Sequence, residues 1–378
     1  DLNGDKVIAQ MRIKSIAGTH IEHPVFKEVL IEADRSKGER GTYLVDVEGV
    51  DLDFDGKYGE DGDGGVNLDR NFTFDYPAFY PESGSYAASE PETKALMDFV
   101  FNHPQISTIL HFGLSNNLTE PERFNSGKAN ERIISSWSED DAKVAAYVSG
   151  IYKGLTKPLG EPTKMEQMPG NFTNTGYYHL GKFSFSTPTW WPSVADSIQR
   201  IKAADVFYQW VAENAISGAV LPWTKVDHPN FPNQEVEVGG VVEIFRNNPP
   251  LPYLNQSSEM HAVFIQDLLK SMAELKFQEP VVTALGDNIY RVELSVTNVG
   301  MMPTYPTIAD KIRHVSKFKT VCELQAGQTF LNGKRLQLYP SLGAGKSQTF
   351  SWLIRGKGMV SIEAGCPTSG IVHVDVKL

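Results

Sequence analysis

The sequence is poor in cysteine, in long apolar runs and in excess positive charge, and each shortage excludes a class of protein. Only Cys322 and Cys366 occur among 378 residues, so a dense disulfide framework is excluded. No run approaches the roughly 18 apolar residues of a membrane-spanning helix, so we expect a chain that is not membrane-spanning. Lys and Arg number 35 against 46 Asp and Glu, a formal net charge of −11, which argues against nucleic acid as a partner.

The cysteines and the first residue bear on the compartment of the protein. Both cysteines fall late in the chain, where one disulfide or two reduced, buried thiols would fit equally well. The chain begins at Asp1 with neither an initiator Met nor the features of a signal peptide, so we expect a removed leader or a longer protein. Many Trp and Tyr beside few Cys indicate a bacterial exported protein, which would be periplasmic, cell-surface or secreted.

The first 277 residues read as an α/β domain. Residues 1–87 are rich in Gly, Asp, Pro and aromatics and predict long ordered loops with short strands. Ser89 and Glu92 form a capping-box pair ahead of an apolar face at Leu96, Phe99 and Val100. The other predicted elements are a strand over 106–112, a helix from Ser138, a strand from 182 to Pro188, and helices near 195–215 and 256–277.

From about residue 280 the hydrophobic pattern changes from helical to alternating. Tyr290, Val292, Leu294 and Val296 recur at every second position, between turns that carry Gly and Asn. This pattern predicts a small antiparallel β-sandwich of immunoglobulin-like type. We therefore divide the chain into an α/β domain over 1–277 and a sandwich over 278–378. If the two cysteines pair, they should join parts of the sandwich.

Two acidic loops have side-chain oxygens at alternate positions, the spacing that suits a hard cation such as calcium. The first loop has Asp1, Asn3 and Asp5, and its ligand set is the weaker of the two. The second loop offers Asp51, Asp53 and Asp55, followed by Gly56 and then Glu60, Asp61 and Asp63. Neither loop has Glu at its twelfth position, so neither is an EF-hand. The alternative is that these residues form Asx turns and aid solubility.

A series of motifs resembles the zinc metallocarboxypeptidases related to carboxypeptidase A. The segments are "GGVNLDRNF" (64–72), "GSYAASEPETKALMDFV" (84–100) and the apolar strand that ends near His111. They are most similar to large bacterial members of that family that carry acidic insertions and a C-terminal sandwich. The resemblance covers most of residues 1–275. It implies a carboxypeptidase-type mixed sheet flanked by helices, ahead of the sandwich.

The same resemblance implies a zinc site, and the chain departs from it in its metal ligands. A catalytic zinc takes three protein ligands and keeps one open position. The family draws two ligands from an HxxE motif, but each of the nine His in this sequence lacks Glu three positions later. His111 occupies about the place of the third ligand, although Phe112 follows it where the family has a small residue. The alternative for His111 is a hydrogen-bonded core residue.

Two further departures concern substrate and catalysis. The family's Asn-Arg pair, which holds the C-terminal carboxylate of a peptide, is Asp69-Arg70 here, and the two residues could instead pair with each other. The catalytic Glu of the family falls at Pro188, which has no proton-accepting group. The nearest acids in sequence, Glu235 and Glu237, are better interpreted as strand-surface or structural carboxylates. Tyr177 and Tyr178 would lie near the site, where aromatic residues most often serve packing.

These observations leave two functional hypotheses. One is a metallocarboxypeptidase-like chain with an incomplete site, inactive by itself, that binds a peptide, a protein C-terminus, a glycan or another protein chain. The other is an active zinc carboxypeptidase whose HxxE ligands lie upstream or in another chain. The sequence before Asp1 would discriminate between them.

Overall fold

The structure is a computed structural model, and its chain divides into two compact units. It describes residues 1–24, 26–59, 65–157, 168–191, 210–211, 214, 216–246 and 248–378. One unit comprises residues 1–65, 156–165 and 188–260, and the other comprises 66–155, 166–187 and 261–378. Among the described residues, no helix combines the length and the apolar character that a membrane crossing requires.

The first unit is built on a six-stranded sheet in the order β3-β2-β4-β1-β8-β7, whose pairs are antiparallel. Its strands are β1 (Gln10–Lys14), β2 (His20–Glu22), β3 (Leu30–Glu32), β4 (Tyr43–Val47), β7 (Val220–Val226) and β8 (Val236–Val241). Short 3-10 helices lie at η1 (Arg35–Lys37) and η5 (Glu243–Arg246). One sheet face buries Met11, Ile13, Val236 and Val238. Both β1 and β8 are buried over most of their length, and these four side chains form the apolar face that an antiparallel sheet needs.

The second unit contains a helical body and the sandwich. The helices and the 3-10 turn of the body are η2 (Leu68–Arg70), α1 (Pro91–Asn102), α2 (Ser126–Ala129), α3 (Glu139–Thr156) and α4 (Phe172–Tyr178). Strands β5 (Thr108–Phe112) and β6 (Phe183–Thr187) pair in parallel. All five residues of β6 are buried, as expected for a strand covered on both faces. Helix α6 (Leu251–Lys270) belongs to the first unit up to Met260 and to the second from His261.

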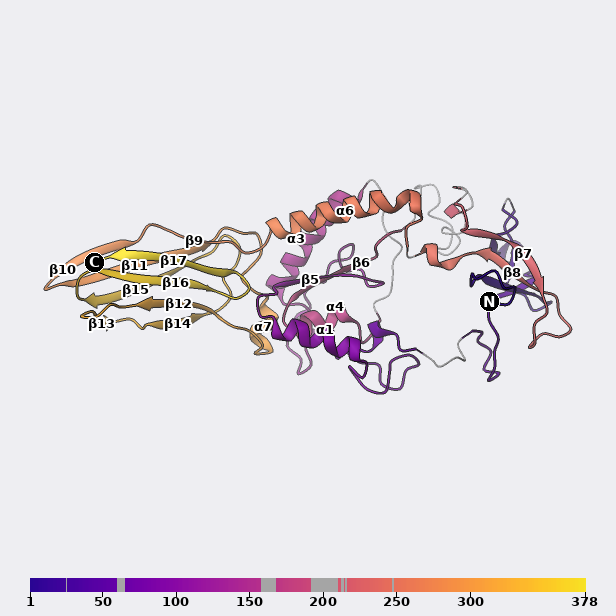
Figure 1. The fold of residues 1–378 in the computed structure, drawn as a ribbon, viewed down its shortest axis with the longest axis horizontal. Helices are drawn as coiled ribbons and strands as arrows, with labels where there is room; N and C mark the ends of the chain where they lie inside the picture. Colours follow the sequence, from indigo (N-terminus) through magenta and orange to yellow (C-terminus); the bar gives the residue numbers. More distant parts are fainter. Residues whose placement is uncertain are drawn as a thin grey trace. The chain divides into compact units, whose positions relative to one another are not determined.

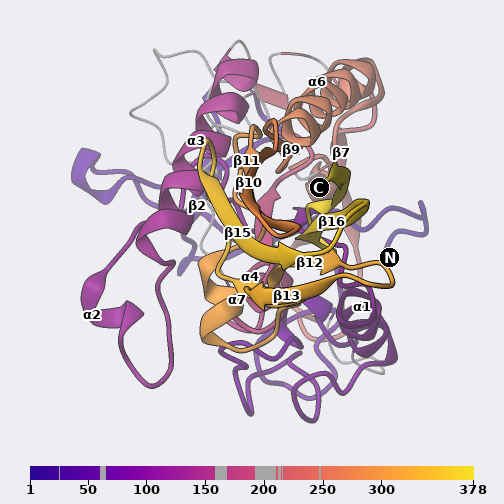
Figure 2. The same ribbon diagram turned by 90° about the vertical axis from the view of Figure 1, so that its left-hand side faces the viewer.

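The C-terminal part is a two-sheet β-structure, seen in yellow and orange in Figure 1 and facing the viewer in Figure 2. One sheet has the order β10-β11-β15-β13, with β9 also paired to β11, and the other has the order β14-β12-β16-β17. The elements are β9 (Leu275–Phe277), β10 (Val281–Gly286), β11 (Ile289–Asn298), α7 (Thr307–Lys311), β12 (Phe318–Glu323), β13 (Thr329–Asn332), β14 (Leu336–Tyr339), β15 (Ser347–Arg355), β16 (Met359–Cys366) and β17 (Gly370–Lys377).

The predicted alternation of the sandwich is present in β11. Val292, Leu294 and Val296 are almost completely buried, and they pack with Phe350 and Trp352 of β15. The coarse prediction of an α/β part followed by a β-sandwich is therefore confirmed, whereas the carboxypeptidase-type sheet stays a prediction. The first sandwich strand, β9, begins at Leu275 and pairs with the end of β11.

Three local predictions differ from the structure. The N-cap of α1 is Glu90 and not Ser89, whose hydroxyl donates a hydrogen bond to the Glu90 carboxylate. Helix α1 buries Thr93 and Val100, while Leu96 and Phe99 are exposed.

The helix expected near 256–277 begins at Leu251 and ends at Lys270, because residues 275–277 pair with β11 as a strand. The helix expected near 195–215 lies mostly outside the described residues.

Candidate functional site

The segment that contains Asp69 and Arg70 is held in place by a buried asparagine that follows it. Asn71 has no exposed surface and makes five side-chain hydrogen bonds. Its amide nitrogen donates to Ser83 O, Tyr86 O and Ser89 Oγ. Its amide oxygen accepts from Glu90 N and from Thr93 Oγ1, the latter at 2.7 Å. One side chain thus ties η2 to the loop 83–89 and to the start of α1.

Asp69 is held by the backbone at the start of α4. Its Oδ1 accepts a hydrogen bond of 2.8 Å from Phe172 N. Burial raises the pKa of the Asp69 carboxyl, and the Phe172 hydrogen bond and the charge of His111 act in the opposite direction. Asp69 therefore faces α4 and His111. The Asp69–Arg70 ion pair considered from the sequence is absent among the described residues.

Arg70 has an aromatic neighbour, and among the described residues its guanidinium has no ion-pair partner. Its guanidinium carbon lies 4.3 Å from the ring centroid of Tyr80, within cation–π range. Its Nε is buried and has no hydrogen-bond partner among the described residues. An unpaired buried donor reduces stability by about 1–3 kcal/mol. A hydrogen-bond acceptor that bound Arg70 would therefore be favoured.

His111 lies on β5, beside the start of α4. Its Nδ1 is 3.4 Å from Thr173 Oγ1, and its ring meets the Phe172 ring edge-on at 5.7 Å. Gly113 leaves room for this imidazole, since a Cβ there would lie 2.6 Å from His111 Cε1. The structure therefore brings Asp69 and His111 together at the first turn of α4, whereas the Arg70 guanidinium lies against Tyr80.

The residues at this place do not fit a catalytic zinc. His111 and Asp69 could supply two ligands, whereas a catalytic zinc needs three from protein. Within the described ranges, the one set of three close acidic or imidazole groups is Asp51, Asp53 and Asp55, in the other unit.

The sequence around Pro188 supplies no carboxylate. Strand β6 ends at Thr187, whose hydroxyl lies 2.6 Å from Tyr152 Oη, and Pro188 is buried. Tyr177 and Tyr178 are also buried, where they stack on Trp137 and Phe74 respectively. None of these residues carries a carboxylate that could act as a general base.

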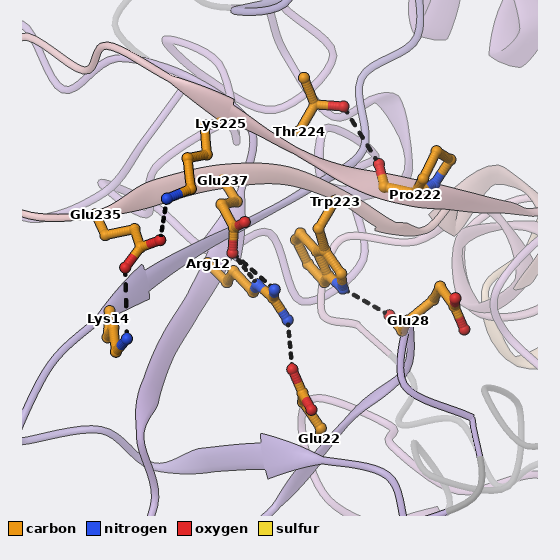
Figure 3. A network of polar contacts seen from close by, with 10 residues as sticks. All are labelled: Arg12, Lys14, Glu22, Glu28, Pro222, Trp223, Thr224, Lys225, Glu235 and Glu237. Carbon is orange, nitrogen blue, oxygen red and sulfur yellow. Dashed lines mark hydrogen bonds and ion pairs between the residues drawn. The ribbon is translucent and has the colours of Figure 1, made fainter.

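Glu235 and Glu237 are held in ion pairs on the first unit's sheet, shown in Figure 3. Glu237 lies 2.7 Å from the guanidinium of Arg12, which also pairs with Glu22 at 3.3 Å. Glu235 contacts both Lys14 and Lys225. Both acids are thus neutralised by strand neighbours, as expected for strand-surface carboxylates.

The acidic loop at 51–57 is closed by its own backbone. Asp51 is 4% exposed and accepts from Phe54 N and Gly56 N, at 2.6 and 3.0 Å. Asp53 and Asp55 each accept from the amide two residues later. Candidate ligand oxygens of the three residues lie within 4.8 Å of one another. The proposed ligands Glu60 and Asp61 lie outside the described residues.

The loop at 1–7 repeats this pattern bond for bond. Asp1 accepts from Gly4 N and Lys6 N, three and five residues later, as Asp51 does. Asn3 and Asp5 accept from the amides two residues later. The first loop has one amide in place of a carboxylate, which makes it the less anionic of the pair.

Comparison with known proteins gives a family match for the sandwich region alone. Residues 274–377 match the model of a family described as "Domain of unknown function (DUF8731)". No curated protein matches the chain.

Several solved structures show local similarity, and those compared are β-glucosidases. DesR from Streptomyces venezuelae, in complex with D-glucose, is 14% identical over 28% of this chain and 15% of its own, with a TM-score of 0.15. The GH3 β-glucosidase from Bifidobacterium adolescentis is 15% identical over 28% of this chain and 17% of its own, with a TM-score of 0.16. β-Glucosidase 3B from Thermotoga neapolitana is 10% identical over 79% of this chain and 56% of its own, with a TM-score of 0.15. The chain spans less than two thirds of each enzyme, and TM-scores this low support no argument on fold or activity.

Proposed function

We propose that this chain is a carboxypeptidase-like binding module that holds the C-terminal carboxylate of a peptide or protein at Arg70 and does not hydrolyse it. The observation that carries this proposal is Arg70 itself, whose buried Nε has no acceptor in the part of the chain that the structure describes, while its guanidinium lies against Tyr80. A carboxylate that binds the guanidinium would form a charge-assisted hydrogen bond, which is about twice as strong as a neutral one.

The position of Asp69 is compatible with this role. An adjacent carboxylate would compete with the ligand if it paired with Arg70. Instead, Asp69 accepts from Phe172 N, and burial raises its pKa, which reduces its tendency to carry charge. The guanidinium of Arg70 therefore stays available to an external anion.

The absence of hydrolysis follows from the chemistry of the residues present. A zinc peptidase needs a third metal ligand and a carboxylate that accepts a proton from the attacking water. The sequence has no HxxE, and Pro188 occupies the position of the base. Loss of a general base alone typically reduces the rate about 10²–10⁴-fold.

The test is a calorimetric titration of the full chain with N-acetyl-Ala-Ala-Phe and with its C-terminal amide. We expect the free acid to bind and the amide to bind at least about tenfold more weakly, from the loss of one charged hydrogen bond. Arg70→Gln should remove the difference between the two peptides. Arg132→Gln is the matched control, since Arg132 is exposed and lies in the same unit. Equal affinity of acid and amide would reject the proposal.

The alternative is an active zinc carboxypeptidase completed by an upstream segment or another chain. The same titration mixture, analysed by mass spectrometry for free Phe with and without added zinc, separates the two. Release of Phe that requires zinc and is lost in His111→Ala would favour the enzyme. The proposed export of the protein would give either form access to extracellular peptides.

A second, separate proposal is that the loop at 51–57 binds calcium. The specific observation is the closeness of Asp51, Asp53 and Asp55 oxygens, three carboxylates within 4.8 Å. Oxygen ligands of this kind suit calcium, which here would order the loop and would take no part in catalysis.

A further inference from the structure

Helix α4 is a short, buried link with contacts at both ends. Six of its seven residues are buried: Phe172, Thr173, Thr175, Gly176, Tyr177 and Tyr178. At its start, Phe172 N donates to Asp69 and the Thr173 hydroxyl contacts His111. Near its end, Tyr177 Oη donates a 2.8 Å hydrogen bond to Asp141 Oδ2.

Asp141 also accepts hydrogen bonds from the sandwich region. The residue has no exposed surface and lies in the first turn of α3. Its Oδ1 accepts from Thr307 N at 2.9 Å, and its Oδ2 accepts from Ile308 N at 3.2 Å, both at the start of α7. Thr307 and Ile308 belong to the segment 274–377 that matches the sandwich family. One carboxylate therefore bonds α4 and α7 together.

Three other contacts hold α7 and the residues after it against the helical body, at the junction seen in Figure 1. Gly181 closely approaches Ala309, since an added Cβ would lie 3.0 Å from the Ala309 Cβ. Lys311 Nζ donates to Ala129 O, and the His314 ring stacks on Phe101 at 4.6 Å. The attachment thus has a defined geometry, in which Asp141 is the group that also contacts α4.

We propose that the sandwich sets the geometry of the Asp69–His111 site through Asp141, Tyr177 and helix α4. Asp141 is a positioning residue in this scheme, because it contacts neither Asp69 nor His111 and acts through Tyr177. In this scheme, the attachment of the sandwich determines where Phe172 N and Thr173 Oγ1 lie.

The test needs no ligand, so its failure is separable from failure of peptide binding at Arg70. In the full chain, NMR records the Phe172 amide and the His111 imidazole resonances. Thr307→Pro removes one of the two sandwich-side N–H donors to Asp141 and leaves Ile308 N in place. Proline fits at residue 307 because it suits the first position of a helix, and the preceding Pro306 has a ψ of 148°, in the range that a residue before proline adopts. Tyr177→Phe removes the hydroxyl and keeps the ring on Trp137.

We expect Thr307→Pro to shift both resonances, and we expect that effect to vanish in the Tyr177→Phe background. Asp140→Asn is the control, since Asp140 is exposed on the neighbouring position of α3 and pairs only with Lys143. If Thr307→Pro lowers the melting temperature while both resonances stay in place, the sandwich is attached but does not act on the site, and the proposal fails. Equal shifts with and without the Tyr177 hydroxyl would also overturn it, because the path would not run through α4.

Discussion

Cys322 and Cys366 lie on adjacent strands but four residues out of register. Cys322 of β12 is paired with Ile362 of β16, and Cys366 lies four positions further along β16. At about 3.4 Å per residue along the strand and about 4.8 Å between strands, the two cysteine Cα atoms are roughly 14 Å apart. A disulfide requires less than about 7 Å, so the two thiols cannot pair in this fold.

Both cysteines should therefore be unreactive, reduced thiols in the folded protein. Each is fully buried, and burial, followed by the charge of Glu323, raises the pKa of the Cys322 thiol to about 12. A thiol-reactive dye should label neither cysteine under native conditions and both after denaturation, without prior reduction. If reductant is needed to expose them, the register of β12 and β16 is wrong.

Asn71→Ala should be among the more destabilising single changes in the second unit. It leaves buried partners of five hydrogen bonds unpaired, at about 1–3 kcal/mol for each group that water cannot reach. We expect a loss of about 3 kcal/mol in the free energy of unfolding, measured by urea denaturation. The comparison is Asn130→Ala, an exposed asparagine at the end of α2. Equal losses for the two variants would contradict the anchoring role of Asn71.

Asp141 should make stability depend on pH with a definite sign. Burial raises its pKa in the folded state, while its hydrogen bonds to Thr307, Ser138, Tyr177 and Ile308 act in the opposite direction. Because the pKa of Asp141 is higher in the folded state, its protonation adds to the free energy of unfolding. That contribution is fully present below the pKa of the unfolded state and is lost as pH rises through the pKa of the folded state.

Unfolding free energies of the wild type and Asp141→Asn should therefore diverge between acid and neutral pH. The wild-type advantage over the variant should be larger at acid pH and smaller at pH 7. Asp140→Asn should show no such trend, since Asp140 is exposed. An advantage that grows toward neutral pH would show that the hydrogen bonds outweigh burial.

Calcium should raise the melting temperature if the 51–57 loop binds it. A free calcium concentration of 100 times the dissociation constant adds about 2.7 kcal/mol to the free energy of unfolding. Asp53→Asn should reduce the increase, and Asp227→Asn, an exposed acid in the same unit, should leave it unchanged. The Lys57 ammonium lies 2.7 Å from Asp55 Oδ2, so Lys57→Gln should strengthen calcium binding by removing a competing cation. Identical melting curves with calcium and with chelator would reject the site.

The sequence allowed the sandwich to be predicted better than the site. Alternation at Val292, Leu294 and Val296 reports burial directly, because residues two apart share a face of a strand. The strand before Pro188 was predicted because proline ends a strand, and the helix after Ser138 because serine caps a helix. Both reasons are local in the sequence.

The contacts of the site depend on partners far apart in the chain, which local patterns do not encode. Asp69 is bonded to Phe172 and Asp141 to Thr307, across 103 and 166 residues. The role of Asn71 was missed although it follows Arg70 in the motif, since nothing local shows that its partners are the loop 83–89 and α1. The exposure of Leu96 and Phe99 was missed because an apolar face does not by itself reveal whether another element covers it.

The burial of α4 makes its backbone a reporter of global opening. Amides in a helix covered on nearly every side exchange with solvent deuterium only when the surrounding structure opens, unlike those of exposed loops. The slowest-exchanging protons of the helical body should therefore include those of Gly176 and Tyr177. Their exchange rates would give the free energy of the largest cooperative opening of this unit, without chemical denaturant.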